Sequence, residues 1–424
     1  MPHPIPEIPG ELLEDSHTAQ YLSERVAGLC GLRGTRFPGS QPVSFTSSSL
    51  SLLERKDFWV CEKSDGVRVL VYILMNENTN HQDVWLIDRK QRYFKVEALH
   101  FPHWERTDQP LRDTILDGEL VLDIDPKTHE ETLRFYAFDC LVLNGENIMA
   151  KSLLSRFGRL RNWVVGPFQK ALKAFPEWRA SAPFEVLAKE QELSYHIAQV
   201  LNVHIPQLQH GHDGLIFTCA ESSYVPGTDE NILKWKPPSE NSIDFKLQLR
   251  FPPSPHDPSQ PDFYAKPVGL LYTWLGRDDY EFFDEMELDD DEWKAWKESG
   301  EQFDDRIIEV SWDNDRSTWK YLRIRDDKPH ANHKNIMKKI MVSITDGVEI
   351  EALLERSDAI RTAWKNREAV RNGKAPPAPE QRRPGGMPLT PAASGGRTAM
   401  PPTPGGYGAT SQPAGSSVVA GLRR

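Results

Sequence analysis

A series of short β-rich runs, separated by turn signals between Phe58 and Arg250, constrains the fold more than any other feature. The runs are WVCEKSDGVRVLVYIL, DVWLIDRKQRYF, TILDGELVLDI, LRFYAFDCLVLNG, HDGLIFT and NILKWKP. Short β-branched and aromatic runs with turns between them are typical of antiparallel strands. Helical patterns at 152–174 and at about 187–201 predict helices that cover the sheets. The fold class is therefore α+β, with antiparallel sheets.

Two breaks divide the chain into domains. Lys236-Pro237-Pro238 interrupts the first strand series, and a Pro-rich stretch follows at 251–261. Beyond it, GLLYTWLG, RIIEVSWD and STWKYLRIR predict further strands, and 331–374 predicts helix. We expect a first domain over 1–238 and a small β-barrel with a terminal helix over 239–374. The last segment, 375–424, holds 10 Pro and 9 Gly and predicts a disordered basic tail.

Charge and cysteine content narrow the class of protein. Ten of the 15 residues from Asp278 to Glu292 are acidic, and without them the net charge of −11 becomes −1. Global charge therefore does not decide for or against a nucleic-acid partner. The four cysteines lack C-x-x-C spacing, which argues against a zinc site and a disulfide framework. No apolar run has membrane-spanning length, and the N-terminus lacks the pattern of a secretory signal, so we expect neither membrane insertion nor export.

Four pairs of polar residues stand two positions apart within apolar strands. Positions i and i+2 of a strand face the same side, so each pair presents two polar groups together. The pairs are Lys63 with Asp65, Asp117 with Glu119, Lys234 with Lys236, and Arg323 with Arg325. Acidic side chains can hold a divalent cation, and cationic side chains can bind phosphates. Together they fit a nucleoside triphosphate with its metal. Neither a P-loop nor a G-x-G-x-x-G motif is present, so side chains must grip the phosphates.

The order of these motifs resembles that of the covalent nucleotidyltransferases. The matching segments are RFPGSQPVSF, KSDGVR at 63–68, Asp88-Arg89, LDGELV, YAFDCLVLNG, DGLIF, LKWKP and YLRIRDDKPHANH. Within that superfamily the chain most closely resembles the mRNA capping guanylyltransferases of the stand-alone fungal type, over roughly residues 30–345. The resemblance implies a nucleotidyltransferase domain followed by an OB-fold lid domain.

The resemblance also implies a reaction with Lys63 as the nucleophile. Lys63 would attack the α-phosphorus of GTP, expel pyrophosphate, and pass the GMP from a lysyl-GMP intermediate to the 5′-diphosphate end of RNA. Only a neutral amine is nucleophilic, and an ordinary lysine has a pKa near 10.4. Neighbouring cations such as Lys234, Lys236 and Arg68 should lower the pKa of Lys63.

Roles for the nucleotide-binding residues follow from the same resemblance. Glu119 would accept hydrogen bonds from the ribose hydroxyls, and Arg68 and Arg89 would lie near the sugar and phosphates. Phe138 would stack on the guanine, and Lys189 would donate to guanine O6. Guanine preference follows from the resemblance alone.

The remaining residues would act on the phosphates and the metal. Lys234 and Lys236 would contact the α-phosphate. Asp65 and Asp213 are the candidate ligands of Mg²⁺ or Mn²⁺, and Asp213 could instead orient Lys63. In the lid, closure would bring a cationic motif onto the β- and γ-phosphates. That motif consists of Arg323, Arg325, Asp327 and Lys328.

Partners are also implied. The H-C-x₅-R motif of a cysteine phosphatase is absent from the sequence, so a separate subunit would supply the RNA 5′-triphosphatase. The phosphorylated C-terminal tail of RNA polymerase II is a second expected partner, and the nucleus is the expected location. Two alternatives stay open from the sequence: an ATP-dependent polynucleotide ligase that uses the same lysine, and an inactive scaffold that binds RNA or polymerase.

Overall fold

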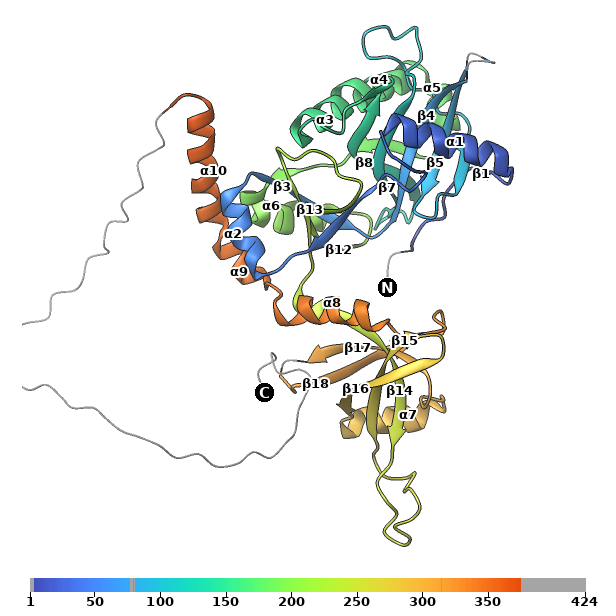
Figure 1. Ribbon diagram of the computed structural model, residues 1–424, viewed down its shortest axis with the longest axis vertical. Helices are drawn as coiled ribbons and strands as arrows, with labels where there is room; N and C mark the ends of the chain where they lie inside the picture. The colour runs from blue at the N-terminus through green and yellow to red at the C-terminus, as the bar shows by residue number, and fades with distance from the viewer. Residues whose placement is uncertain (1–3, 77–78, 80, 314, 375–424) are drawn as a thin grey trace, which may run out of the picture.

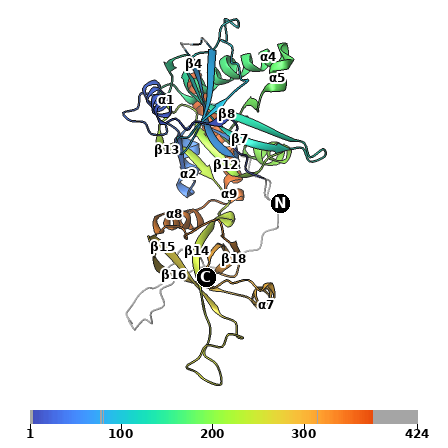
Figure 2. The same cartoon turned by 90° about the vertical axis from the view of Figure 1, so that its right-hand side faces the viewer.

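Two globular bodies stand one above the other in Figure 1 and again, after a quarter turn, in Figure 2. The structure is a computed structural model that describes residues 4–76, 79, 81–313 and 315–374. The expected disordered tail, 375–424, lies outside these residues. Within the described chain, no helix combines the length and the apolar character needed to cross a membrane.

The first body contains two sheets. The larger has the strand order β1 (Glu11–Leu12), β6 (Tyr93–Val96), β5 (His81–Asp88), β4 (Val67–Asn76), β7 (Thr114–Ile124), β8 (Glu131–Leu143) and β10 (Glu185–Ala188), with β9 (Glu146–Asn147) paired to β8. The smaller has the order β11 (Glu192–Leu193), β3 (Phe58–Ser64), β12 (His212–Cys219), β13 (Gly227–Trp235) and β2 (Ser40–Ser44). All pairings are antiparallel except β10 with β8 and β13 with β2, so the predicted α+β class is confirmed.

Strand β4 has an uninterrupted apolar sequence because it is buried on both faces. Val69 and Val71 face a core that also contains helices α3 (Leu153–Arg159) and α4 (Gly166–Ala174), joined by the π-helical turn η1 (Leu160–Val165). Leu70 and Tyr72 face the opposite core, which contains α1 (Ser16–Leu29). Since both faces are covered by helices, both sets of alternating side chains are buried. The helix expected at 152–174 is thereby confirmed.

The helix expected at about 187–201 is only partly present. Its first residues belong to β10, which pairs in parallel with β8, and to β11. Short helical turns follow, namely η2 (Ser194–His196), α6 (Ile197–Gln199), η3 (Val200–His204) and η4 (Ile205–Gln207). Pairing with β8 therefore overrides the local helical pattern. As a result, Lys189 lies directly after a strand of the larger sheet.

The second body is a five-stranded barrel. Its strand order is β16 (Asp279–Glu287), β15 (Val268–Gly276), β14 (Ser242–Arg250), β17 (Ile307–Asp313) and β18 (Thr318–Ile324). The two edge strands meet, because the Trp319 indole donates to Asp284 Oδ2 at 3.1 Å. Helix α7 (Asp290–Ser299) joins the third and fourth strands in chain order, and α8 (Lys334–Thr345) follows the fifth. A five-stranded, partly open barrel is the architecture expected for the OB-fold.

The acidic run at 278–292 forms β16 and the start of α7. Asp289 and Glu292 make a capping box, and two further acidic residues, Asp290 and Asp291, stand in the first turn of α7. Acidic side chains stabilise a helix N-terminus because they complement its dipole. In β16, Glu285 pairs with Arg250 at 2.7 Å. The run therefore has a structural explanation within the barrel.

Helix α8 packs on the barrel core. The two helices that follow it, which we expected in the barrel domain, return to the first body instead. Helices α9 (Ile350–Glu355) and α10 (Ser357–Arg371) pack beside α2 (Ser47–Arg55) (Figure 1). Leu353, Ile360 and Trp364 are buried in the core of the smaller sheet. Arg367 Nε donates to Asp57 at 2.7 Å. The barrel is thus joined to the first body at two places, through η5 (Pro238–Glu240) and through the segment that follows α8.

Candidate active site

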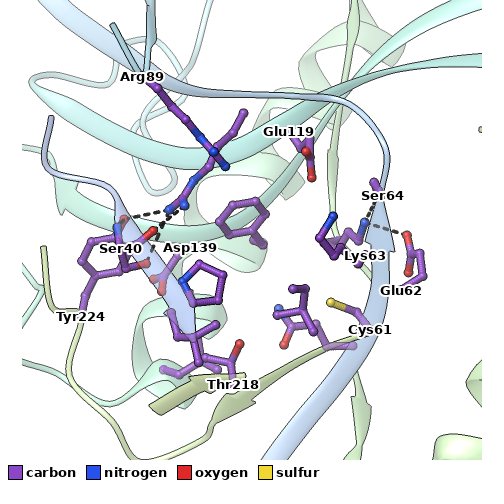
Figure 3. Close-up of a pocket in the computed structure, with 18 residues that line it drawn as sticks. Ser40, Cys61, Glu62, Lys63, Ser64, Arg89, Glu119, Asp139, Thr218 and Tyr224 are labelled. Atoms are coloured by element: carbon purple, nitrogen blue, oxygen red, sulfur yellow. Dashed lines mark hydrogen bonds and ion pairs between the residues drawn. The ribbon is translucent and has the colours of Figure 1, made fainter. Parts of the chain in front are cut away.

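A pocket lies between the two sheets of the first body (Figure 3). Its empty volume is about 830 Å³, open mouth included, and a concave site with a few convergent polar groups is typical of ligand binding. Side chains from both sheets line it. They include Ser40, Pro42, Cys61, Glu62, Lys63, Ser64, Arg68, Arg89, Glu119, Phe138, Asp139, Lys189, Ile216, Thr218 and Tyr224. Five of the other predicted site residues therefore share one cavity with Lys63.

Lys63 lies near the end of β3, with its side chain in the pocket. The turn that follows requires glycine, since a Cβ on Gly66 would stand 2.3 Å from the Leu120 carbonyl oxygen. A Cβ on Gly214 would stand 2.0 Å from the Trp235 carbonyl oxygen, at a φ of +139°. These two close approaches fix β3 and β12 at the place where Lys63 Nζ donates to Asp213 Oδ1 at 2.5 Å. Asp213 therefore orients Lys63 in this state.

Lys234 and Lys236 lie at the end of β13, on the side of Lys63. Lys234 is in register with Ile216, which is itself in register with Cys61, two positions before Lys63. Burial, and then the charge of Lys63, lowers the pKa of Lys234. Among the described residues, neither lysine has an ion-pair partner. Lys234 thus stands near Lys63 and Asp213, and the backbone of Lys236 approaches Gly214, but neither lysine lines the pocket.

Glu119 and Arg89 also point into the cavity (Figure 3) without a hydrogen bond or ion pair to the described part of the chain. Burial raises the pKa of the Glu119 carboxyl, and the charges of Lys189 and Lys63 oppose that effect. Burial and the charge of Arg68 lower the pKa of Arg89. Polar groups that are half-buried yet unpaired are costly unless a ligand completes them. Their position favours a polar, anionic ligand with hydrogen-bond donors.

Arg68, by contrast, is already engaged by the protein. Its guanidinium binds Asp117 through Nε at 2.9 Å and Nη2 at 2.6 Å, and its side chain is 8% exposed. Burial alone would lower the pKa of Arg68, but the charge of Asp117 raises it. The Arg68 guanidinium carbon lies 5.5 Å from the centre of the Phe138 ring. Arg68 therefore supports the pocket wall at Phe138, whose ring is partly exposed in the cavity.

Lys189 is a buried cation at the wall opposite Arg68. Its Nζ lies 2.7 Å from Glu62 Oε1 and also donates to Ser64 Oγ. Burial would lower the pKa of Lys189, but the charge of Glu62 outweighs it and raises the pKa. The Glu62 carboxyl has its pKa lowered to about 2, because Lys189 and a hydrogen bond from His210 outweigh burial. Lys189 is thus charged and held in a fixed position.

The candidate metal ligands are few. No group of three or more potential metal-binding His, Cys, Asp or Glu side chains occurs in the described ranges. Asp213 offers a carboxylate next to Lys63, and Glu119 offers another in the pocket. Asp65 is exposed beyond the end of β3, in an outer hollow that also contains Arg89 and Asp88. One or two carboxylates fit Mg²⁺, which usually takes its other ligands from water and substrate phosphates.

The predicted barrel residues lie outside the pocket, on β18 and the turn after it. Arg323 pairs with Glu309 at 2.7 Å. Arg325 binds Asp244 at 2.9 Å and Asp327 at 2.8 Å. Lys328 also pairs with Asp244. The structure therefore does not bring this cationic motif together with Lys63, and acids of the chain neutralise it instead.

Several site residues were not predicted individually. The Tyr224 hydroxyl donates to Asp117 Oδ2 at 2.5 Å, and Asp139 binds Arg156 at 2.8 Å. Ser40 accepts from Arg68 through its carbonyl oxygen. Ser40 and Asp139 stand in the quoted motifs RFPGSQPVSF and YAFDCLVLNG, so those motifs contained a signal for them. Tyr224 stands in an irregular loop and shows none.

Comparison with known proteins identifies the family. A model of the mRNA capping enzyme catalytic domain matches residues 7–238, and a model of the mRNA capping enzyme C-terminal domain matches residues 240–354. The chain is 40% identical to the mRNA-capping enzyme subunit alpha of Schizosaccharomyces pombe, covering 85% of this chain and 89% of that protein. It is 35% identical to the same subunit of Saccharomyces cerevisiae, covering 89% and 91%.

A solved structure of the ATP-dependent DNA ligase from bacteriophage T7 covers 68% of this chain and 98% of the ligase chain, with 16% identity and a TM-score of 0.32. These values say nothing of ligase activity. The two family matches are consecutive along the chain, and the fungal relatives are matched over most of their length. The chain therefore belongs to the mRNA capping enzyme family, and it is a guanylyltransferase of that family.

Proposed function

We propose that Lys63 is the nucleophile of this guanylyltransferase. Its Nζ would form a bond to the α-phosphorus of GTP while the bond from that phosphorus to pyrophosphate breaks. A terminal oxygen of 5′-diphosphate RNA would then attack the same phosphorus, and the Lys63 amine would leave. The observation that carries this proposal is the shared pocket, in which Lys63 faces unpaired Glu119 and Arg89.

The amine must lose its proton before it attacks. In the structure, Lys63 Nζ donates to Asp213 Oδ1 at 2.5 Å. We infer that Asp213 exchanges this contact for a role in nucleotide binding, as a ligand of Mg²⁺ or Mn²⁺. When bound, the cation would supply positive charge to the phosphates. Lys234 and Lys236 would add to that charge, and they would also oppose reprotonation of Lys63.

The nucleoside would fill the rest of the pocket. Phe138 presents a partly exposed ring for the base, and Lys189 presents a charged donor for a base carbonyl such as guanine O6. Glu119 has free acceptor oxygens for ribose hydroxyls, and Arg89 has free donors for phosphate. The Arg68 guanidinium, bound to Asp117, would contribute through the position of the Phe138 ring.

The barrel would supply cations for the β- and γ-phosphates. Arg323, Arg325 and Lys328 would leave Glu309 and Asp244 as the barrel moves toward the pocket, and Asp327 would remain with Arg325. The two connections between the bodies, at η5 and after α8, would act as the hinge. Reopening would then admit RNA.

Incubation with α-labelled GTP or α-labelled ATP tests the proposal. The expected result is covalent label from GTP with a divalent cation, and its transfer to 5′-diphosphate RNA. Label from ATP alone would instead support the ligase alternative. Absence of label from either nucleotide, with RNA binding retained, would support the inactive scaffold.

Further partners are also proposals. We propose that a separate subunit supplies the RNA 5′-triphosphatase and that the phosphorylated tail of RNA polymerase II recruits the enzyme in the nucleus. The family membership supports both proposals, since a cap is added to nascent transcripts that must first lose a phosphate. Purification of the tagged chain from nuclear extract, with a phosphatase-treated control, tests both contacts.

A further inference from the structure

A buried polar cluster lies at and behind the pocket wall, and of its members only Lys189 has a role in the mechanism described above. It consists of Glu62, Ser64, Asp123, Lys189 and His210, each less than 10% exposed. The residues come from β3, β7, the segment after β10 and the segment before β12. Burial of so many polar groups is costly unless each is paired. The cluster therefore needs a function in stability or in the site.

His210 stands at the centre of this cluster. Its Nδ1 lies 2.5 Å from Asp123 Oδ1. Its Nε2 lies 3.6 Å from Glu62 Oε1 and 3.3 Å from Ser64 Oγ. A neutral imidazole can donate from only one nitrogen, whereas an imidazolium donates from both. Burial lowers the pKa of His210, but the hydrogen bond to Asp123 and the nearby Glu62 carboxylate outweigh burial and raise it.

The same contacts connect His210 to the pocket. Glu62, which His210 faces on one side, binds Lys189 Nζ at 2.7 Å on the other. Ser64 accepts a hydrogen bond from Lys189 and directly follows Lys63. With an imidazolium, the charges of Glu62 and Asp123 are balanced by those of Lys189 and His210. Outside this set, Arg134 Nη1 and the Tyr136 hydroxyl bind the second oxygen of Asp123.

We propose that His210 is a positioning residue for nucleotide binding, which acts through Glu62 and Ser64 on Lys189. Asp123 anchors the imidazolium, and the imidazolium shares the charge of Glu62 with Lys189. Lys189 is thereby kept at the pocket wall with a donor available to the ligand. This inference rests on the proposed function of the pocket, in which Lys189 contacts the base.

The physical consequence concerns affinity more than chemistry. Without the donor at His210, the Glu62 charge is compensated by Lys189 alone, and the ammonium is drawn onto Glu62 and away from the ligand. Lys63 remains on β3 with Asp213, so the chemical step changes little at saturating nucleotide. When a substitution weakens binding of the substrate and of the transition state equally, KM rises and kcat is unchanged.

The experiment is a double-mutant cycle in the full chain, with self-guanylylation as the readout. We expect His210→Gln to raise the KM for GTP about tenfold, with kcat changed less than about threefold. Lys189→Met should raise KM at least as much. The double variant should be no worse than Lys189→Met alone, because His210 acts through Lys189. If His210→Gln is poorly folded, Glu62→Gln tests the same connection: it removes the carboxylate that holds Lys189 in place and should also raise the KM for GTP.

His103→Gln is the matched control. His103 is 6% exposed, accepts backbone hydrogen bonds from Glu105 and Arg106, and is not a pocket residue. Its KM for GTP should equal that of the wild type. Independent, additive effects of His210→Gln and Lys189→Met, or a lowered melting temperature with unchanged KM, would overturn the inference. Absence of covalent GMP in the wild type would instead overturn the proposed function.

Discussion

The pocket of the first body and the cationic motif of the barrel contain similar residue types in opposite states. In the pocket, Glu119 and Arg89 lack ion-pair partners in the described chain. In the barrel, Arg325 and Lys328 are both bound to Asp244. The difference teaches that one half of the site is assembled without ligand. The other half is held by internal acids, and we propose that movement of the barrel releases it.

The largest effect should come from the pocket side. Lys63→Ala removes the only group proposed to form the covalent bond, so self-guanylylation should fall at least ~10³-fold in single-turnover labelling. Lys56→Ala is the control, because Lys56 is exposed and binds Asn231 away from the pocket. Covalent label that persists in Lys63→Ala would show that Lys63 is not the nucleophile.

The next effect tests the barrel side. Arg325→Ala should slow formation of the enzyme–GMP intermediate by about 10²-fold, since a cation on the departing pyrophosphate is lost. Transfer of GMP from a preformed intermediate to RNA should change little, because pyrophosphate has already left. Measurement of the two half-reactions separates these steps.

Arg306→Ala is the control for the barrel, since Arg306 pairs with Asp326 on the exposed surface. An equal slowing of both half-reactions by Arg325→Ala would mean that Arg325 stabilises the barrel rather than the transition state. The cationic motif of the barrel would then not reach the pocket during formation of the enzyme–GMP intermediate.

A third prediction concerns the connection between the bodies. Trp364 of α10 is 7% exposed in the core of the smaller sheet. Trp364→Ala should lower the free energy of unfolding by about 3–5 kcal/mol, because a large core side chain is removed. Urea denaturation measures this loss. Phe263→Ala, at a side chain 65% exposed, should change stability by less than ~0.5 kcal/mol. Equal stabilities of the two variants would contradict the packing of α10.

The smallest effect is the pH dependence of stability. The pKa of folded His210 is raised, so its contribution is complete below the unfolded value of about 6.5 and is lost as pH rises through the folded value. Groups that face it are Asp123, Glu62, Lys189 and Tyr136. Urea denaturation across this pH range should show a decline in wild type that is weaker in His210→Gln. Parallel declines would contradict a charged His210.

The strands and most pocket residues could be predicted because their signal is local. A period of two in strands, together with the motif resemblance, predicted that Lys63 and Glu119 share a site with cationic groups. Asp65 lies outside the strand period, since β3 ends at Ser64, but the exposed turn still places it in one hollow with Lys63. The strand pattern also did not predict that Asp117 forms an ion pair with Arg68 and is therefore not available to a ligand.

The remaining features depend on contacts that are distant in sequence. No local pattern links Asp244 to Arg325, or Asp57 to Arg367, because each pair is joined only by the tertiary fold. The return of α10 to the first body has the same origin, since an amphipathic helix can cover any apolar surface of suitable shape. The strand at β10 was missed because its partner β8 lies some 50 residues away in the chain.

The most direct test of the central claim is peptide mass spectrometry of the protein after exposure to GTP and a divalent cation. Our account predicts one added GMP, located on Lys63 in the peptide that contains KSDGVR. GMP on a different lysine, or no covalent GMP at all, would contradict it.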